Sequence, residues 1–434
     1  MVTRRGLIAG SAVGALGVLT GCGLRPVGAP TVPSGPIDTD GDLAGSIRFQ
    51  TWNLRAGYQD YFQGLIDDFV ADRPDVRINW IDQPAEGYSD SLQVDAANLN
   101  LPDVINIAPD LGLPLARAGL LLDIASARPQ AQATYLDGAW DDYTYEDPSG
   151  TYAFPWYLNT GPMFYNRALF EEAGLDPDSP PESWDELFDQ AMVMGEAAGG
   201  DFYMIGQLPS IADLGMYGVE LMDDSEQRFT FDSKRAVQMV ERYREAYERQ
   251  GLLPDATVLT ATDSGERFQS GQVAFTGGSA YDLDNFRENA PDLYENLGMT
   301  EAITNTGYVN MTSQGMAVSS RTDHPEIAIA FAEYLTGQEE QTEFSRLVDV
   351  FPSTDGALED PYFTEDDGTD SGEVRVLSAA QVDQARNHQP LVWTEEMSVE
   401  LQRQLSDAVV GRTSAQEALS ASADQANRLI GATS

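Results

Sequence analysis

The first part of the chain alternates short apolar strands with amphipathic helices. Ile47, Phe49 and Thr51 alternate with polar residues, which predicts a strand that ends at Trp52. Apolar residues then recur at helical spacing, and the same order follows twice more. The predicted strands cover 46–52, 76–81 and 103–107, and the predicted helices cover 61–70, 89–99 and a segment that closes near Gly119. This order predicts an α/β fold in which helices cover a parallel sheet.

Helices later in the chain are indicated by their capping residues. Ser183-Trp184-Asp185-Glu186 has the spacing of a capping box. Ser233 precedes a helix that stops at Gly251, and Pro325 fits the first turn of a helix that ends at Gly337. The last predicted helix runs from Ser414 to Gly431. So long a chain exceeds one small core, and we expect two lobes.

Polar residues follow two of the predicted strands. Trp52 and Asn53 end the first strand, and Asp110 follows the third. Ligands of parallel α/β sheets bind beyond the carboxyl ends of the strands, so we expect these three residues to face a ligand. The structural alternatives are a tryptophan packed over the sheet and an aspartate that caps a helix.

The first 22 residues have the pattern of an export signal. Arg4 and Arg5 precede an uncharged run from Gly6 to Gly21, which is too short and too rich in glycine to span a membrane. The run ends in Leu19-Thr20-Gly21-Cys22, which resembles a bacterial or archaeal lipobox. The resemblance implies a lipidated Cys22 that anchors the protein at the extracellular face of the cell membrane. Sec export and twin-arginine export both stay open.

A flexible tether is expected after Cys22. Residues 23–45 contain four prolines among Gly, Ser, Thr and Asp, with few apolar side chains to bury. Because Cys22 is the only cysteine of the chain, an internal disulfide is excluded and the fold depends on its core.

Charge and composition restrict the function. The chain has 70 acidic and 25 basic residues, a net charge of −45, so nucleic acid and anionic lipid surfaces are poor partners. Its two histidines, His324 and His388, give little material for a catalytic triad or a metal site. Phosphate-binding glycine patterns are missing as well. We therefore expect no enzyme, no metal and no cofactor, although paired carboxylates for glycoside hydrolysis stay an alternative.

Three segments in order resemble one family. They are Ala153-Phe154-Pro155-Trp156-Tyr157-Leu158-Asn159-Thr160-Gly161 with its continuation to Leu187, Phe268-Gln269-Ser270-Gly271 with its continuation to Tyr281, and Gly315-Met316-Ala317-Val318-Ser319-Ser320. Together they are similar to the family-1 extracellular solute-binding proteins of ABC sugar importers, the maltose-binding type in its lipoprotein form. The similarity extends from about Ser46 to the C-terminus.

The resemblance implies a two-lobe, periplasmic-binding-protein-like fold with a hinge and an inter-lobe ligand cleft. Lobe 1 is expected at 46–156 plus 313–350, and lobe 2 at 157–312 plus 351–434. The implied function is that of a monomeric receptor, which binds a mono- or oligosaccharide and delivers it to the permease of an ABC transporter.

A sugar site needs aromatic rings and planar polar side chains, and four segments supply candidates for them. Trp156, Tyr157 and Asn159 lie at a predicted lobe crossing, with packing between the lobes as the alternative for the aromatic pair. The further candidates are Gly278, Ser279, Tyr281, Ser313, Gln314 and Trp393. Core packing is an equally good interpretation of Trp393, and the glycine segment can be a plain turn.

Two other functions stay open at this point. A surface-anchored glycoside hydrolase would use a similar aromatic cleft. A receptor of the same kind could bind a polyamine, a polyol phosphate or a peptide instead of a sugar. Phosphate binding would call for basic residues, and Arg55 is the only one near a predicted site.

Overall fold

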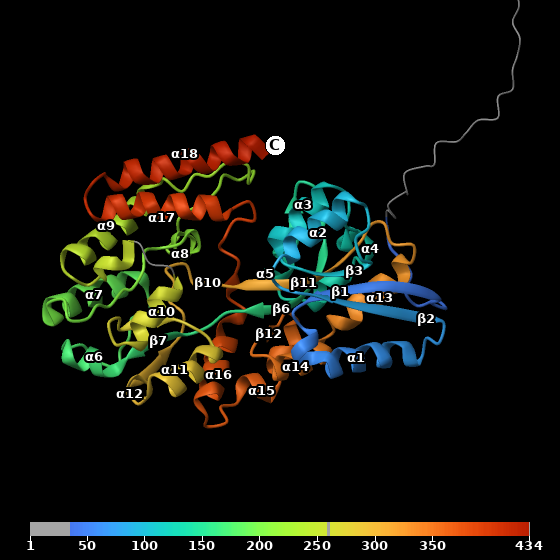
Figure 1. Ribbon diagram of the computed structural model, residues 1–434, viewed down its shortest axis with the longest axis horizontal. Coiled ribbons are helices and arrows are strands. Elements are labelled where there is room, and N and C mark those ends of the chain that lie inside the picture. The colour runs from blue at the N-terminus through green and yellow to red at the C-terminus, as the bar shows by residue number, and fades with distance from the viewer. Residues whose placement is uncertain (1–34, 258–260, 434) are drawn as a thin grey trace, which may run out of the picture. The chain divides into compact units, whose positions relative to one another are not determined.

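The computed structural model describes residues 35–257 and 261–433 (Figure 1). The predicted export signal and Cys22 lie outside the described residues. Within the described part of the chain, no helix combines the length and the apolar character that crossing a membrane requires.

Part of the expected tether is packed against the folded chain. Leu43 is buried, with 9% of its surface exposed, and Ile37 contacts the same hydrophobic cluster. The backbone N–H of Ile37 also donates a hydrogen bond to the carbonyl of Ala127 at 3.0 Å. The expectation of a flexible tether up to residue 45 is therefore wrong for residues 37–43, because these two apolar side chains find a core to join.

The first lobe is built on a six-stranded sheet. In spatial order its strands are β12 (Phe351–Pro352), β6 (Ala153–Asn159), β11 (Thr312–Val318), β3 (Val104–Ile107), β1 (Gly45–Trp52) and β2 (Val76–Gln83). β1 is parallel to both β2 and β3, which confirms the first three predicted strands. β11 is antiparallel to β3 and to β6.

Helices cover both faces of this sheet (Figure 1). One face carries α1 (Arg55–Ala71), α13 (Pro325–Leu335) and α14 (Gln338–Leu347), and the other carries α2 (Tyr88–Ala97) and α3 (Pro109–Arg117). Phe49 of β1 packs against the first group, whereas Ile105 of β3 packs against the second. Burial on both faces explains why β3 is buried at all four of its positions.

Short elements connect β3 to β6 on the first lobe. They are α4 (Ile124–Ala127), the 3-10 turn η1 (Ala131–Thr134), α5 (Asp137–Asp141) and the hairpin of β4 (Thr144–Glu146) and β5 (Ser149–Thr151). Asp123 caps α4, since its carboxylate accepts the N–H of Ser126.

The second lobe contains the three-stranded antiparallel sheet of β8 (Phe275–Gly277), β7 (Met163–Asn166) and β9 (Leu297–Thr300). Its helices are α6 (Arg167–Glu172), α7 (Trp184–Ala198), α8 (Ile211–Met216), α9 (Lys234–Glu248), α10 (Ala261–Gln269), α11 (Ala280–Asn289), α12 (Pro291–Tyr294), α17 (Glu395–Val409) and α18 (Ala415–Thr433). The remaining elements are η2 (Pro254–Thr257), η3 (Asp355–Glu359), α15 (Pro361–Thr364), α16 (Asp370–Val382) and the two-stranded sheet of β10 (Val309–Asn310) and β13 (Ala385–Arg386).

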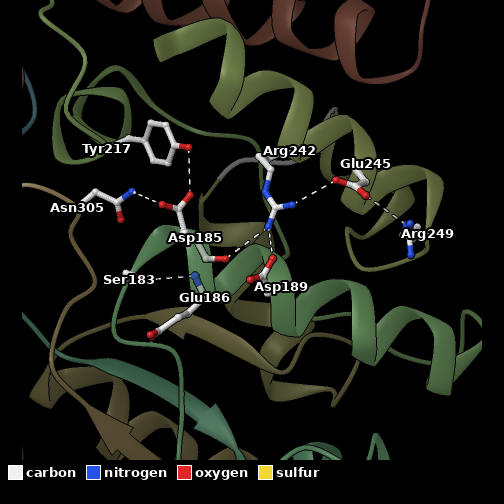
Figure 2. A network of polar contacts seen from close by, with 9 residues as sticks. All are labelled: Ser183, Asp185, Glu186, Asp189, Tyr217, Arg242, Glu245, Arg249 and Asn305. Atoms are coloured by element: carbon white, nitrogen blue, oxygen red, sulfur yellow. Dashed lines mark hydrogen bonds and ion pairs between the residues drawn. The ribbon is translucent and has the colours of Figure 1, made fainter.

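A polar network joins α7, α8 and α9 of the second lobe (Figure 2). Arg242 of α9 bonds to the Asp189 carboxylate of α7 and pairs with Glu245 at 3.2 Å. The Asp185 carboxylate accepts hydrogen bonds from the Tyr217 hydroxyl and the Asn305 amide, both at 3.2 Å. The network fixes the start of α7 against its neighbours.

The predicted capping box at Ser183 forms only in part. The Ser183 hydroxyl accepts the N–H of Glu186 at 3.3 Å, as expected (Figure 2). The Glu186 carboxylate, however, accepts the N–H of Glu182 at 2.8 Å and not that of Ser183. The helix predicted after Ser233 is confirmed as α9, with Ser233 as its N-cap.

Candidate functional site

The pairing of strands brings several predicted residues to one edge of the six-stranded sheet. Because β11 is antiparallel to β3 and to β6, its first residue, Thr312, pairs with Asn159 at the end of β6. Gly315 pairs with Ile107 at the end of β3. Asn159 at the end of β6 therefore lies at the same edge of the sheet as Asn53 and Asp110, which follow β1 and β3.

The predicted residues at the end of β1 and after β3 lie at this edge and are not among the walls of the two larger cavities described below. Trp52 is half-buried, with its ring centroid 6.2 Å from that of Tyr88. Asn53 is exposed and adopts a left-handed backbone conformation with φ of 55°. Asp110 is exposed in the first turn of α3, whose N-cap is Ala108, so the capping alternative for Asp110 is wrong.

A cavity of about 460 Å³ lies where the chain passes from β6 to β7. We call it the crossing cavity. Its walls are Asn159, Thr160, Gly161, Pro162, Met163, Gly277, Gly278, Ser279, Asn310, Thr312, Ser345, Asp349, Val350, Phe351, Tyr362, Val374, Arg375 and Ser378. Three predicted residues, Asn159, Gly278 and Ser279, are thus brought together from segments about 120 residues apart.

Two glycines allow the walls of the crossing cavity to approach each other. The N–H of Gly278 donates to the carbonyl of Pro162 at 3.2 Å. A Cβ atom on Gly161 would lie only 2.0 Å from the carbonyl oxygen of Gly278. The crossing segment and the end of β8 can pack at this distance because neither position carries a side chain.

Replacing Gly161 by alanine should therefore destabilise the protein. The methyl group meets a backbone oxygen, which cannot rotate away, and overpacking of this kind costs roughly 1–3 kcal/mol. Thermal unfolding would measure the loss. Gly64→Ala is the matched control, since the space around Gly64 in α1 is open, and an equal melting temperature for both variants would contradict the argument.

The crossing cavity holds a single guanidinium among its described walls, that of Arg375. This group already has partners, because its Nε donates to the carbonyl of Tyr362 at 2.5 Å and an Nη lies 3.3 Å from Asp367. It also lies 4.1 Å from the centre of the Tyr362 ring. The remaining polar walls are mostly neutral hydroxyl and amide groups, which suit hydroxyl-rich ligands.

A smaller hollow of about 230 Å³ shares walls with the crossing cavity. The shared residues are Thr160, Gly161, Met163, Gly277 and Asn310, and the other walls are mainly apolar. Thr160, Asn310 and Tyr362 were missed by sequence reasoning. Asn310 and Thr312 are close in sequence to the predicted Ser313, so the residues just before Ser313 were the available signal.

Three other predicted residues are used by internal hydrogen bonds or packing. Ser313 is buried and donates its hydroxyl proton to Asp142. The Gln314 side chain accepts a hydrogen bond from the buried Asn106 amide at 3.0 Å. Tyr157 packs its ring 4.8 Å from that of Trp156, and burial raises the pKa of its phenol above the usual value. None of the three lines the crossing cavity.

Two predicted tryptophans lie in hydrophobic cores. Trp156 is 2% exposed and stacks on Phe344 with ring centroids 4.8 Å apart. Trp393 is 7% exposed and packs against Phe229 and Phe231, while its indole N–H bonds to a serine hydroxyl. Both predicted contacts with ligand are therefore corrected to core packing. The Tyr281 side chain lies outside the described residues.

A second cavity, of about 450 Å³, lies between α3, α5 and the hairpin of β4 and β5 on one side and the segment after α8 on the other. We call it the acidic cavity, because its walls include Asp141, Asp142, Glu146, Asp147, Asp223 and Glu226. In the part of the chain that the structure describes, no cluster of His, Cys, Asp and Glu side chains has the arrangement of a metal site.

The sheet with helices on both faces, the second lobe and the segments that cross between them define a two-lobe periplasmic binding protein. The chain belongs to the bacterial extracellular solute-binding protein family, whose model matches residues 55–342. This membership confirms the family that the sequence segments resemble.

Solved structures share the fold. The cyclic alpha-maltosyl-1,6-maltose binding protein of Arthrobacter globiformis is 20% identical with a TM-score of 0.72, over 89% of this chain and 99% of that one. The sugar-binding protein MalE of Xanthomonas citri is 17% identical with a TM-score of 0.72, over 90% and 98% of the two chains. At these identities, the likeness defines the fold.

Curated relatives match a part of the chain. The sn-glycerol-3-phosphate-binding periplasmic protein UgpB of Escherichia coli is 23% identical over 309 residues, which are 64% of this chain and 66% of UgpB. A binding protein of Brucella abortus is 24% identical over 269 residues, or 58% of this chain and 62% of that protein. The matches thus span slightly less than two thirds of these relatives.

Proposed function

We propose that the protein is the carbohydrate receptor of an ABC importer. It binds a mono- or oligosaccharide between its lobes and delivers it to the membrane permease without chemical change. In this proposal the protein acts as a monomer, and a lipid on Cys22 holds it at the extracellular face of the cell membrane.

The crossing cavity is the observation that supports a sugar ligand. Asn159 and Thr312 offer a neutral amide and a neutral hydroxyl in the walls of this cavity. The hydroxyls of Thr160 and Ser279 already donate to the Asn310 carbonyl and to Asp282, but both keep lone pairs that can accept from a ligand. Sugar hydroxyls both donate and accept, so they pair best with amide and hydroxyl groups of this kind. The names of the sugar-binding structural neighbours point the same way.

A polyol phosphate is the second candidate ligand. The name of UgpB suggests it, and Arg375 places a guanidinium in the crossing cavity. A phosphate would have to compete with Asp367 and with the Tyr362 carbonyl for that guanidinium. Asp349, in the same walls, would repel the phosphate charge. A neutral sugar meets neither obstacle.

A ligand screen by thermal shift tests the proposal. The full chain in detergent is unfolded with mono- and oligosaccharides, polyamines, peptides and glycerol phosphates. We expect one sugar to raise the melting temperature in a saturable way and to be recovered intact. A response to a phosphate alone would support the second candidate, and consumption of the sugar would make the protein a glycoside hydrolase.

Asn159→Ala should weaken sugar binding about tenfold. The exposed Asn159 side chain lines the crossing cavity, and the loss of one amide that pairs with a hydroxyl is worth ~1.4 kcal/mol. Isothermal titration with the sugar from the screen measures the change. Asn79→Ala, at an exposed position of β2, is the control. Equal affinities of both variants would remove Asn159 from the site.

A further inference from the structure

Residues 385–388 form a strap that contacts both lobes. Ala385 and Arg386 are β13, which pairs in parallel with β10. The backbone N–H of His388 donates to the Asn310 side chain at 3.0 Å, and its ring nitrogen lies 3.2 Å from the Tyr308 carbonyl. The strap is thus attached to β10 and to Tyr308 before it, in the segment that leads into β11.

Two glycines show how closely the strap is packed. A Cβ atom on Gly138 of α5 would lie 2.5 Å from the Ala385 carbonyl oxygen. A Cβ atom on Gly215 of α8 would lie 3.0 Å from the His388 ring. One end of the strap therefore rests on the first lobe and the other end on the second.

Asp142 lies beneath the strap at the end of α5. Only 7% of its surface is exposed, and it lines the acidic cavity together with Asn387 and His388 of the strap. Ser313 of β11 donates its hydroxyl proton to the Asp142 carboxylate, and the Asn387 side chain of the strap lies near enough to favour the charged form of this carboxyl. Among the described residues, Asp142 takes part in no ion pair, so its charge has no buried counter-ion.

The surroundings of Asp142 favour a bound proton. Burial raises the pKa of its carboxyl to about 7, the hydrogen bonds from Ser313 and Asn387 oppose this rise, and the neighbouring Asp141 adds to it. Other ionisable groups face the acidic cavity from the elements around it: Tyr145 and Glu146 from β4, Arg117 from α3, Arg386 and His388 from the strap, and Asp223 and Glu226 from the opposite wall.

We propose that Asp142 is a proton-controlled latch for the strap. When the carboxyl is protonated, it stays buried beneath the strap. When it ionises, a buried charge without a counter-ion must be hydrated, and Ser313 and Asn387 offset only part of this cost. Because only 7% of the Asp142 surface is exposed while the strap is in place, fuller hydration requires the strap to move aside. The strap then separates from α5, so the attachment between the two lobes loosens as the pH rises.

Trypsin can report the state of the strap, because it cleaves after Arg386. The side chain of Arg412 is 71% exposed and lies in a turn, which makes it an internal reference for the activity of trypsin at each pH. The full-length protein is digested briefly between pH 6.0 and 8.5. Mass spectrometry then gives the ratio of initial cleavage at Arg386 to that at Arg412.

We expect the ratio to rise at least threefold with a midpoint near pH 7, and to stay low at every pH in Asp142→Asn. Ser313→Ala removes a donor to the ionised carboxylate, so its midpoint should lie at higher pH; this variant keeps the test valid if Asp142→Asn does not fold. A ratio that does not change with pH in the parent, or a rise that persists in Asp142→Asn, would overturn the latch.

Discussion

Replacing Trp156 by alanine is expected to lower the free energy of unfolding by ~3–5 kcal/mol, as removal of a fully buried aromatic side chain does. The indole is 2% exposed. It stacks on Phe344 with an interplanar angle of 19° and meets Phe62 edge to face at 6.0 Å. The cavity left behind would lie between β6, α1 and α14. Because these three elements are held in place by their other contacts, they can move only far enough to fill part of it. Chemical denaturation measures the loss.

The same variant separates a core role from a ligand role. If Trp156 is a core residue, the folded fraction of Trp156→Ala keeps the parent affinity for sugar, and Trp156→Phe recovers part of the lost stability. The opposite pattern, with an unchanged free energy of unfolding and a large loss of affinity, would return Trp156 to the binding site. Isothermal titration well below the melting temperature provides the second measurement.

Strands and helices of both lobes could be predicted where local sequence patterns agree with the fold. Apolar alternation predicted β1, β2 and β3 within a few residues, and Ser233 marked the start of α9. Such signals are local, since capping and side-chain periodicity depend on neighbours in sequence. The partial capping box at Ser183 shows the limit of such local predictions. The Glu186 carboxylate can accept either the N–H of Ser183 or that of Glu182, and the sequence does not tell which of the two it takes.

The aromatic pair of β6 was misjudged for a physical reason. The prediction placed Trp156 and Tyr157 in a loop at the lobe crossing, where two adjacent aromatic side chains cannot easily both be buried. They lie instead in β6, where the pairing with β11 is irregular, and both rings pack against Phe344. Both faces of this sheet are covered, so Trp156 is buried and Tyr157 is half-buried. Which faces are covered depends on helices far away in sequence, such as α14, and adjacent residues carry no sign of that.

The crossing cavity was predictable only in part for a related reason. Asn159, Gly278 and Ser279 belong to segments that resemble a known family, and the structure brings them together. Tyr362 and Arg375 reach the same walls from α15 and α16. Their position depends on where β12 pairs with β6, and a two-residue strand has no sequence pattern to reveal it.

Asp142 should make the stability of the whole protein depend on pH. The pKa of its carboxyl is about 7 in the folded chain against an ordinary value of 3.8. Between pH 3.8 and pH 7, the native state therefore holds a proton that the unfolded state has released. The stabilising effect of the protonated form is complete below about pH 4, and it is lost as the pH rises through 7. The full difference corresponds to on the order of 4 kcal/mol.

Urea denaturation of the parent and of Asp142→Asn between pH 4 and 8.5 tests this expectation. Asparagine keeps the shape and the hydrogen bond from Ser313 but has no charge to bury, so its advantage over the parent should grow with pH and level off above about 7.5. Only the difference between the two proteins is diagnostic. Burial lowers the pKa of His388, which makes the parent less stable on the acid side, and this effect is common to both.

The latch sets an upper limit on that difference. An ionised Asp142 can be hydrated either by global unfolding or by release of the strap alone, and the protein takes the route of lower free energy. If release of the strap needs less than the full ~4 kcal/mol, the advantage of Asp142→Asn stops growing at that smaller value, at the pH where cleavage at Arg386 begins to rise. If the stability advantage of Asp142→Asn stops growing at the same pH at which cleavage at Arg386 begins, the buried carboxyl is connected to the strap. If the stability advantage reaches its full size without any cleavage at Arg386, the strap stays closed.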